Sequence, residues 1–254
     1  DEVVKDATCR LLTYALNGNA DFMGDDIHYA SNHDFVGIEF SIHGMLDGRV
    51  RVGMPGKFNA DNALAALVVC TLALSGGSGV LDDHTKQAIL GSLVKVRVDG
   101  RMEIAHVSKK CSVIVDYAHN AVSMESLLTT LRDYHPKRLV CVFGCGGNRA
   151  RDRRYSMWEI GGKMADLCII TADNPRFEKN EDIIKDIEVG LAKTDGTYLV
   201  IPDRREAIFY AIRNAEEGDM IAIIGKGHED YQEIEGVKHH FLDREVVEEA
   251  VNNV

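Results

Sequence analysis

From Val113 to the end of the chain, short apolar segments alternate with amphipathic segments. The expected strands are Val113–Val115, Leu139–Phe143, Leu167–Thr171, Tyr198–Ile201 and Met220–Ile224. Between the first two strands, over 122–134, apolar residues recur at helical spacing. Strands that are apolar throughout and separated by helices indicate a parallel sheet covered on both faces. The pattern therefore predicts a Rossmann-like α/β domain with a mostly parallel sheet.

The first hundred residues have a different pattern. The expected elements are strands at 11–14, 26–31, 36–42 and 49–52 and helices at 60–74 and 82–93. Gly37–Ile42 alternates with period two, which predicts a half-buried antiparallel strand, and Asp47-Gly48 predicts a hairpin turn. The turn at Asp99-Gly100 marks a boundary. We therefore expect two parts, residues 1–100 and residues 101–254.

Polar and glycine-rich segments follow four of the expected strands. They are Asp116-Tyr117-Ala118-His119-Asn120, Gly144-Cys145-Gly146-Gly147-Asn148-Arg149, Asp173-Asn174-Pro175-Arg176 and Gly225-Lys226-Gly227-His228-Glu229. In a doubly wound sheet, ligands bind beyond the carboxyl ends of the strands. Because four such segments would meet at one edge of the sheet, the sequence predicts a ligand pocket there.

Each segment also has a structural interpretation that stays open. Asp116 could cap the following helix, and the glycines of 144–147 could serve a tight turn, because the dinucleotide fingerprint is incomplete. Lys226 lies between two glycines, but the chain has no GxxxxGK[ST] phosphate loop. His228 and Glu229 could hold a metal, although holding an ammonium group suits Glu229 better. No metal site is predicted from these residues.

The charge balance restricts the partners. The chain has 29 basic and 40 acidic residues and a net charge of −11, which argues against sequence-independent nucleic-acid binding. No apolar run approaches the ~18–20 residues that span a bilayer. Positive charge is local, since Arg149, Arg151, Arg153 and Arg154 are opposed by Asp152 alone. Because arginine matches carboxylate and phosphate oxygens, this +3 cluster predicts an anion site.

Cysteine usage favours a reducing compartment. The six cysteines are Cys9, Cys70, Cys111, Cys141, Cys145 and Cys168. None forms a CxxC pair or has zinc-finger spacing, and several lie in apolar runs, such as Val69-Cys70-Thr71. We expect buried, reduced thiols in a cytoplasmic protein that binds small molecules and neither nucleic acid nor membrane.

Together these strings resemble the Mur ligase family. Gly100-Arg101-Met102-Glu103 precedes them and Asp230-Tyr231-Gln232 follows them in the family's order and spacing. The resemblance runs from about Gly53 to the C-terminus. It implies an ATP-dependent, Mg²⁺-requiring ligase of peptidoglycan biosynthesis. In that reaction ATP phosphorylates the D-glutamate side chain of UDP-MurNAc-L-Ala-D-Glu, and the amine of a diamino acid attacks the acyl phosphate to form an amide.

The resemblance also implies roles for individual residues. On the nucleotide side, Asn59 and Asn62 match the adenine-side motif, with Asn62 the better candidate. Arg101 matches the catalytic arginine that reaches the γ-phosphate, and Asp116 matches the acid near the ribose. The residues that match the pocket for the incoming diamino acid are Arg149, Asn174, Arg176, Gly225 and Glu229.

The Asp-Asn-Pro-Arg string resembles the version associated with meso-diaminopimelate rather than L-lysine. The distal carboxylate of diaminopimelate needs a cation such as Arg176, whereas Glu229 would hold the distal ammonium group. The sequence departs from the family pattern near this pocket at Ala121, Val122, Tyr155, Trp158 and Asn180. An L-lysine-adding ligase, or a divergent ligase with another amine substrate, is therefore the alternative.

The family's phosphate loop, Mg²⁺ ligands and UDP-sugar domain would precede residue 1. We therefore expect residues 1–100 to be an incomplete central ATP-binding domain and residues 101–254 a complete amino-acid-binding domain. As a fragment of a ligase, the chain would not turn over ATP by itself. The other hypothesis is a stand-alone amino-acid-binding module.

Overall fold

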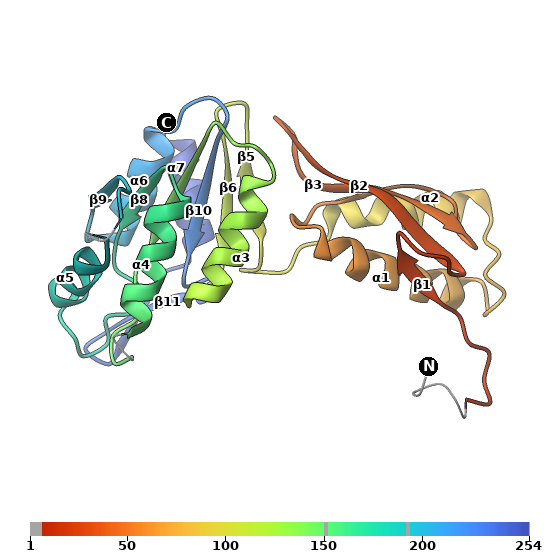
Figure 1. Cartoon of the computed structure of the whole chain (residues 1–254), viewed down its shortest axis with the longest axis horizontal. Coiled ribbons are helices and arrows are strands. Elements are labelled where there is room, and N and C mark those ends of the chain that lie inside the picture. The colour runs from red at the N-terminus through yellow and green to blue at the C-terminus, as the bar shows by residue number, and fades with distance from the viewer. Residues whose placement is uncertain (1–6, 150–151, 192–193, 254) are drawn as a thin grey trace. The chain divides into compact units, whose positions relative to one another are not determined.

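The computed structural model of the chain describes residues 7–149, 152–191 and 194–253. Its internal contacts divide the chain into two compact units (Figure 1). One unit comprises Gly37–Val96 and the residues before Ser31, and the other comprises Arg97–Val254 together with Ser31–Val36. In the described part of the chain, no helix is long and apolar enough to cross a membrane.

The first unit contains a four-stranded sheet with the order β1-β2-β3-β4. Its strands are β1 (Tyr14–Leu16), β2 (Phe22–Asn32), β3 (Phe35–Gly44) and β4 (Gly48–Val52). β1 runs parallel to β2, and β3 and β4 form an antiparallel pair in which Ile42 lies opposite Gly48. The predicted hairpin is therefore confirmed, but Gly48 of the predicted Asp47-Gly48 turn is the first residue of β4. Ile38 and Phe40 of β3 are also buried, as the alternating pattern predicts.

Two helices and a short 3₁₀ turn complete the first unit. They are α1 (Phe58–Leu74), α2 (Asp83–Ser92) and η1 (Leu93–Lys95). The buried face of α1, which includes Leu64 and Leu67, packs into one core with Phe40 and Val50 of the sheet. Asp82 caps α2 through its side chain, which accepts a hydrogen bond from the backbone N–H of Thr85 at 2.9 Å. Both predicted helices are confirmed.

The second unit is built on a six-stranded sheet with the order β5-β6-β10-β7-β8-β9. Its strands are β5 (Glu103–Val107), β6 (Cys111–Asp116), β7 (Arg138–Phe143), β8 (Leu167–Ile170), β9 (Tyr198–Val200) and β10 (Asp219–Ile224). The last five of these strands are parallel to one another, which confirms the mostly parallel sheet. β5, which the sequence pattern did not predict, pairs antiparallel with β6 at one edge.

Five helices cover the two faces of this sheet. They are α3 (Ala121–Arg132), α4 (Asp152–Met164), α5 (Asn180–Leu191), α6 (Arg204–Arg213) and α7 (Asp243–Asn252). α3, α4 and α5 pack in sequence on one face, and α6 and α7 pack together on the other (Figure 1). A hairpin of β11 (Tyr231–Ile234) and β12 (Val237–His240) precedes α7. The fold is therefore the predicted doubly wound α/β type.

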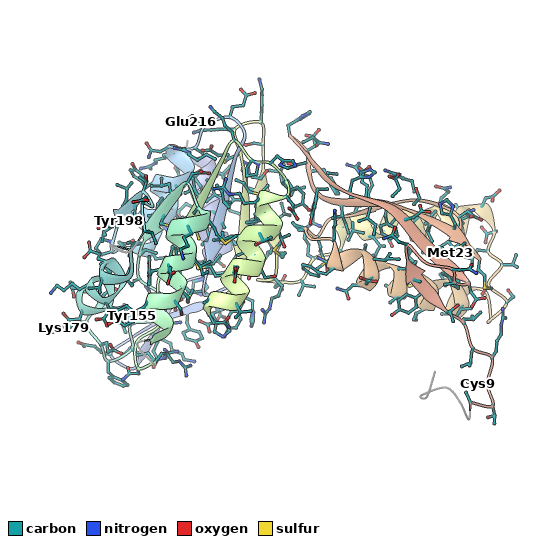
Figure 2. The ribbon with its side chains drawn as sticks, in the orientation of Figure 1. Cys9, Met23, Tyr155, Lys179, Tyr198 and Glu216 are labelled. Atoms are coloured by element: carbon teal, nitrogen blue, oxygen red, sulfur yellow. The ribbon has the colours of Figure 1, made fainter. Side chains whose placement is uncertain are left out.

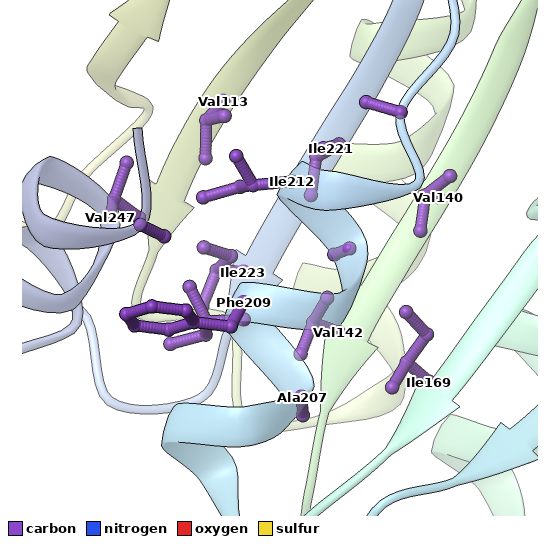
Figure 3. Packing of buried hydrophobic residues seen from close by; sticks show 14 of the residues in the cluster. Val113, Val140, Val142, Ile169, Ala207, Phe209, Ile212, Ile221, Ile223 and Val247 are labelled. Carbon is purple, nitrogen blue, oxygen red and sulfur yellow. The ribbon is translucent and has the colours of Figure 1, made fainter. Parts of the chain in front are cut away.

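One hydrophobic core of this unit lies between the sheet and helices α6 and α7. Figure 3 shows Val113, Val140, Val142, Ile169, Ile221 and Ile223 of the strands packed against Ala207, Phe209, Ile212 and Val247 of the helices. On the opposite face, the apolar stripe of α3 predicted from the sequence is buried as well. Because the strands are packed on both faces, the loops at their carboxyl ends start from fixed positions.

The cysteines follow the prediction in part. Cys111, Cys141, Cys145 and Cys168 are buried free thiols, and burial raises the pKa of the Cys168 thiol to about 12. The prediction is wrong for the other two, because Cys9 (Figure 2) and Cys70 are exposed. Cys70 lies in an apolar run, but a helix packed on one face must turn part of such a run outward.

Candidate functional site

A polar pocket opens at the carboxyl ends of β6, β7, β8 and β10, where the sequence predicts one. Its lining comprises Tyr117, His119, Gly144, Cys145, Gly146, Arg149, Met157, Asp173, Asn174, Arg176, Gly225 and Glu229. The space within the pocket, about 630 Å³, includes volume that is open to solvent. The structure thus brings together the five residues that match the family's amino-acid pocket, although they come from three different loops.

The glycine-rich segment after β7 packs directly on the segment after β8. A side chain at Gly147 would collide with the carbonyl oxygen of Pro175, and one at Gly144 would collide with that of Thr171. The backbone N–H of Gly147 donates to the carbonyl oxygen of Asn174 at 2.9 Å. These glycines are therefore required for close approach of two backbones, in addition to the tight turn they permit.

Arg176 is held in the pocket wall by contacts with Gly147 and Glu233. One terminal nitrogen of its guanidinium donates to the carbonyl oxygen of Gly147 at 2.8 Å, and Nε lies 3.5 Å from Glu233 Oε2. The backbone of Arg176 has a φ of +53° and donates to the carbonyl oxygen of Glu233 at 3.0 Å. The β11–β12 hairpin therefore fixes the position of this cation, although the Asp-Asn-Pro-Arg string that contains Arg176 includes no residue from that hairpin.

Glu229 provides a carboxylate in the pocket lining, and both of its oxygens accept hydrogen bonds. Asn174 Nδ2 donates to Oε2 at 2.8 Å, and the Tyr117 hydroxyl donates to Oε1 at 3.4 Å. Lys226 Nζ lies 3.7 Å from Oε2. Burial, followed by the charge of Glu229, raises the pKa of Tyr117, so this hydroxyl keeps its proton. The lining of the pocket thus includes the carboxylate of Glu229 and the guanidinium group of Arg176.

A group of buried charges lies beneath the loops after β8 and β10. Burial raises the pKa of the Asp173 carboxyl, and the cations of Arg204 and Lys226 oppose this effect. Arg204 is 1% exposed and donates to both carboxylate oxygens of Asp243 at 2.7 Å. It also donates to the carbonyl oxygens of Ala172 and Ile224, which end or follow β8 and β10. Sequence reasoning missed this pair because only the fold brings α6 and α7 to these strand ends.

Asp116 ends β6 and is 8% exposed. Its carboxylate accepts hydrogen bonds from the backbone N–H groups of Met102 and Ala118, both at 2.7 Å. Burial outweighs these hydrogen bonds and raises the pKa of Asp116. The alternative that Asp116 caps the next helix is wrong, since Asn120 caps α3 with a side-chain hydrogen bond from Ser123.

Gly225 and Arg101 have different relations to the pocket. Gly225 has a φ of +112°, and a Cβ there would lie 2.5 Å from Asp173 Oδ2, so glycine is required. Arg101 is exposed and stacks over the Tyr117 ring, with its guanidinium carbon 4.9 Å from the ring centroid. Through Tyr117, the predicted nucleotide-side arginine therefore lies beside the amino-acid pocket.

The remaining predicted residues are placed elsewhere. Asn59 and Asn62 lie in the first unit, where Asn59 is buried and donates to the carbonyl oxygen of Pro55 at 2.7 Å. Asn62 Nδ2 donates to Asn59 Oδ1 at 3.1 Å. Arg149 is exposed at the pocket rim, whereas Arg151 and the side chains of 152–154, which complete the predicted +3 cluster, lie outside the described residues.

No cluster of three or more His, Cys, Asp or Glu side chains suited to a metal ion occurs among the residues that the structure describes. His228 lies beside the Tyr117 ring, at a centroid distance of 5.5 Å.

The residues that depart from the family pattern lie in different environments. Val122 is 77% exposed in the first turn of α3, next to Ala121. Trp158 is fully buried in α4 and stacks on Phe143, with the ring centroids 4.0 Å apart. Tyr155 lies on the same helix (Figure 2), and Asn180 begins α5. Trp158 therefore packs against the last residue of β7, which the glycine-rich loop follows directly.

The sheet and its pocket define an α/β domain of the doubly wound class, with a charged small-molecule pocket at the carboxyl edge of its strands. Residues 100–227 match the family described as Mur ligase, glutamate ligase domain, and residues 1–70 match the Mur ligase middle domain. The chain therefore belongs to the Mur ligase family, and the predicted membership is confirmed.

Curated relatives give the same result. The UDP-N-acetylmuramoyl-L-alanyl-D-glutamate–2,6-diaminopimelate ligase 2 of Clostridium acetobutylicum is 40% identical over 98% of this chain and 50% of its own length. The ligase of the same name, without the numeral, from Aquifex aeolicus is 42% identical over 93% of this chain and 44% of its own. The chain spans about half the length of the curated relatives it matches.

Solved structures share the fold. A structure of a UDP-N-acetylmuramoyl-L-alanyl-D-glutamate–2,6-diaminopimelate ligase aligns with a TM-score of 0.75 and 34% identity, over 98% of this chain and 49% of its own. The UDP-N-acetylmuramate-alanine ligase of Thermotoga maritima aligns with a TM-score of 0.60 and 16% identity, over 95% of this chain and 47% of its own. The second similarity supports the fold alone.

Proposed function

We propose that this chain contributes to an ATP-dependent ligase that joins meso-diaminopimelate to UDP-MurNAc-L-Ala-D-Glu in peptidoglycan biosynthesis. Family membership and relatives named as 2,6-diaminopimelate ligases support the reaction. Residues 101–254 would bind the diamino acid, and residues 1–100 would belong to the ATP-binding domain.

The observation that carries the proposal is the pair of opposite charges in one pocket. Glu229 presents a carboxylate to the distal ammonium group, and Arg176, with Arg149 at the rim, presents a guanidinium to the distal carboxylate. Asn174 and Gly225 also line this pocket. Holding the distal end in this way leaves the other amine free to attack an activated carboxyl group.

In this proposal, the residues that bind ATP are ones that do not line the pocket. Arg101 would contact the transferred phosphate, Asp116 would lie near the ribose, and Asn59 and Asn62 would lie on the adenine side. The exposed guanidinium of Arg101 suits phosphate oxygens. ATP supplies the phosphoryl group that activates the carboxylate, and Mg²⁺ neutralises phosphate charge during that transfer.

Binding of three ligands, meso-diaminopimelate, L-lysine and L-2-aminopimelate, distinguishes the proposed contact with Arg176 from the proposed contact with Glu229. L-Lysine lacks the distal carboxylate of meso-diaminopimelate, and L-2-aminopimelate lacks the distal ammonium group. Calorimetry on the 254-residue chain should show that meso-diaminopimelate binds more tightly than either. Arg176→Ala should weaken meso-diaminopimelate and L-2-aminopimelate and leave L-lysine unchanged.

Glu229→Gln should give the crossed pattern, weakening meso-diaminopimelate and L-lysine while leaving L-2-aminopimelate unchanged. Tighter binding of L-lysine than of meso-diaminopimelate would favour the L-lysine-adding alternative. If neither substitution affected meso-diaminopimelate, the assignment of this pocket would be wrong.

A further inference from the structure

Lys226 is a buried cation in direct contact with the Glu229 carboxylate. Its side chain is 0% exposed, and its Nζ lies 3.7 Å from Glu229 Oε2. The same Nζ donates a hydrogen bond to the carbonyl oxygen of Tyr231 in β11. Neighbouring Gly225 and Gly227 have φ values of +112° and +52°. Burying an ammonium group is unfavourable unless it has partners. For Lys226 these partners are the Glu229 carboxylate and the Tyr231 carbonyl oxygen.

The two oxygens of Glu229 have unequal surroundings. Asn174 Oδ1 accepts a hydrogen bond from the backbone N–H of Glu233 at 2.8 Å, which fixes the amide orientation and turns Nδ2 toward Glu229. Oε2 therefore faces both Asn174 Nδ2 and Lys226 Nζ. Oε1 faces the Tyr117 hydroxyl at 3.4 Å, a long hydrogen bond. Oε1 is the oxygen better placed to accept a ligand donor.

We propose that Lys226 is a positioning residue that anchors Glu229 Oε2 to the β11–β12 hairpin, so that Oε1 receives the distal ammonium group of the diamino acid. Lys226 does not touch the ligand, because no part of its side chain is exposed. The inference rests on the proposed function, since it assigns the ammonium contact to Glu229.

The charges around Lys226 favour this arrangement. Burial lowers the pKa of its ammonium group and Arg204 acts in the same direction, whereas the carboxylates of Asp173, Asp243 and Glu229 oppose them. Lys226 thus shares its buried surroundings with several carboxylates. Without this cation, a carboxylate at Glu229 would gain from turning toward water, and Oε1 would leave its position.

Lys226→Met tests the anchor with the same three ligands. We expect affinity for meso-diaminopimelate and L-lysine to fall roughly tenfold, with L-2-aminopimelate unchanged. Lys226→Gln, which can keep a hydrogen bond to Tyr231, should give the same pattern and replaces Lys226→Met if the latter does not fold. Lys238→Met is the matched control, because exposed Lys238 stacks on the Tyr231 ring at 3.9 Å and does not contact Glu229.

Equal weakening of all three ligands would indicate collapse of the pocket and would overturn the inference. Tighter binding of meso-diaminopimelate would show that Lys226 competes with the ligand as a cation, and would overturn it as well.

An unfolding cycle separates this inference from the proposed function. Lys226→Met, Glu229→Gln and the double variant are compared by chemical denaturation, which needs no ligand. We expect the two substitutions to be non-additive by roughly fivefold or more in the unfolding equilibrium constant. Additive effects would overturn the anchor while leaving the proposed function standing. A non-additive cycle in a chain that does not bind diaminopimelate would contradict the proposed function and the ammonium contact instead.

Discussion

Asn174 Nδ2 donates a hydrogen bond to Glu229 Oε2 at 2.8 Å and so joins two loops that are 55 residues apart in the sequence. The same side-chain amide accepts a hydrogen bond from the backbone of Glu233 in β11. Asn174 therefore connects the loop after β8, the loop after β10 and the β11–β12 hairpin. The carboxylate of the pocket and the loop that carries Arg176 are parts of one hydrogen-bonded assembly.

Asn174→Asp should separate these loops, because it replaces a donor with a second carboxylate facing Glu229. We expect the affinity for meso-diaminopimelate to fall by at least about tenfold, since like charges at hydrogen-bond distance repel strongly. Calorimetry measures the change. Asn252→Asp, on the exposed end of α7, makes the same chemical change far from the loops and should have no effect on binding. Equal affinity for the Asn174→Asp variant and the unchanged chain would contradict the geometry.

Gly147→Ala tests the contact between the loops after β7 and β8. A Cβ at this position collides with the Pro175 carbonyl oxygen, so we expect a loss of about 1–3 kcal/mol in unfolding free energy together with weaker ligand binding. Gly91→Ala is the control, because nothing lies near a Cβ there and alanine stabilises a helix by about 0.5–1 kcal/mol relative to glycine. A Gly147→Ala variant as stable as the unchanged chain would contradict the close packing.

Arg204→Met tests the buried ion pair beneath the pocket. Removing Arg204 leaves Asp243 buried without its partner, and we expect a loss of about 3–5 kcal/mol in unfolding free energy by chemical denaturation. Arg205, the next residue of α6, pairs with Glu249 at the exposed surface. Arg205→Met should therefore change stability little. If the two variants were equally stable, the buried pair would not have the structural role assigned to it.

Asp116 should make stability depend on pH. Burial raises its pKa above the usual 3.8, so the folded chain binds this proton more tightly than the unfolded chain. The resulting stabilisation is present below about pH 3.8 and is lost as pH rises through the folded pKa. The unchanged chain should thus lose unfolding free energy relative to Asp116→Asn as the pH rises above about 3.8, until the folded-state carboxyl has also lost its proton. A constant difference, or one of opposite sign, would contradict the burial of this carboxyl.

The sequence was sufficient to predict the parallel strands of the sheet, although not the antiparallel edge strand β5, and the place of the pocket. Parallel strands put their carboxyl ends on one edge, so the segments that contain Asp116, Gly144, Asn174 and Glu229 had to meet there. The residues of these loops could be predicted in this way, because polar residues that directly follow an apolar strand can be recognised in a sequence.

Other features of the site depend on packing that periodicity does not reveal. Arg204 and Asp243 lie on different helices and meet only when α6 and α7 share a face of the sheet. The burial of Lys226 depends on the β11–β12 hairpin, which passes over it. Tyr117 was visible as part of a motif, but its position between Arg101 and Glu229 was not.

The most direct test of the account follows the backbone amides of the isotope-labelled chain by NMR during titration with meso-diaminopimelate. The account predicts saturable shifts concentrated at 144–149, 173–176 and 225–229, and their loss in the Arg176→Ala, Glu229→Gln double variant. Saturable shifts that lie elsewhere, or that persist in the double variant, would contradict the assignment of this pocket to the diamino acid.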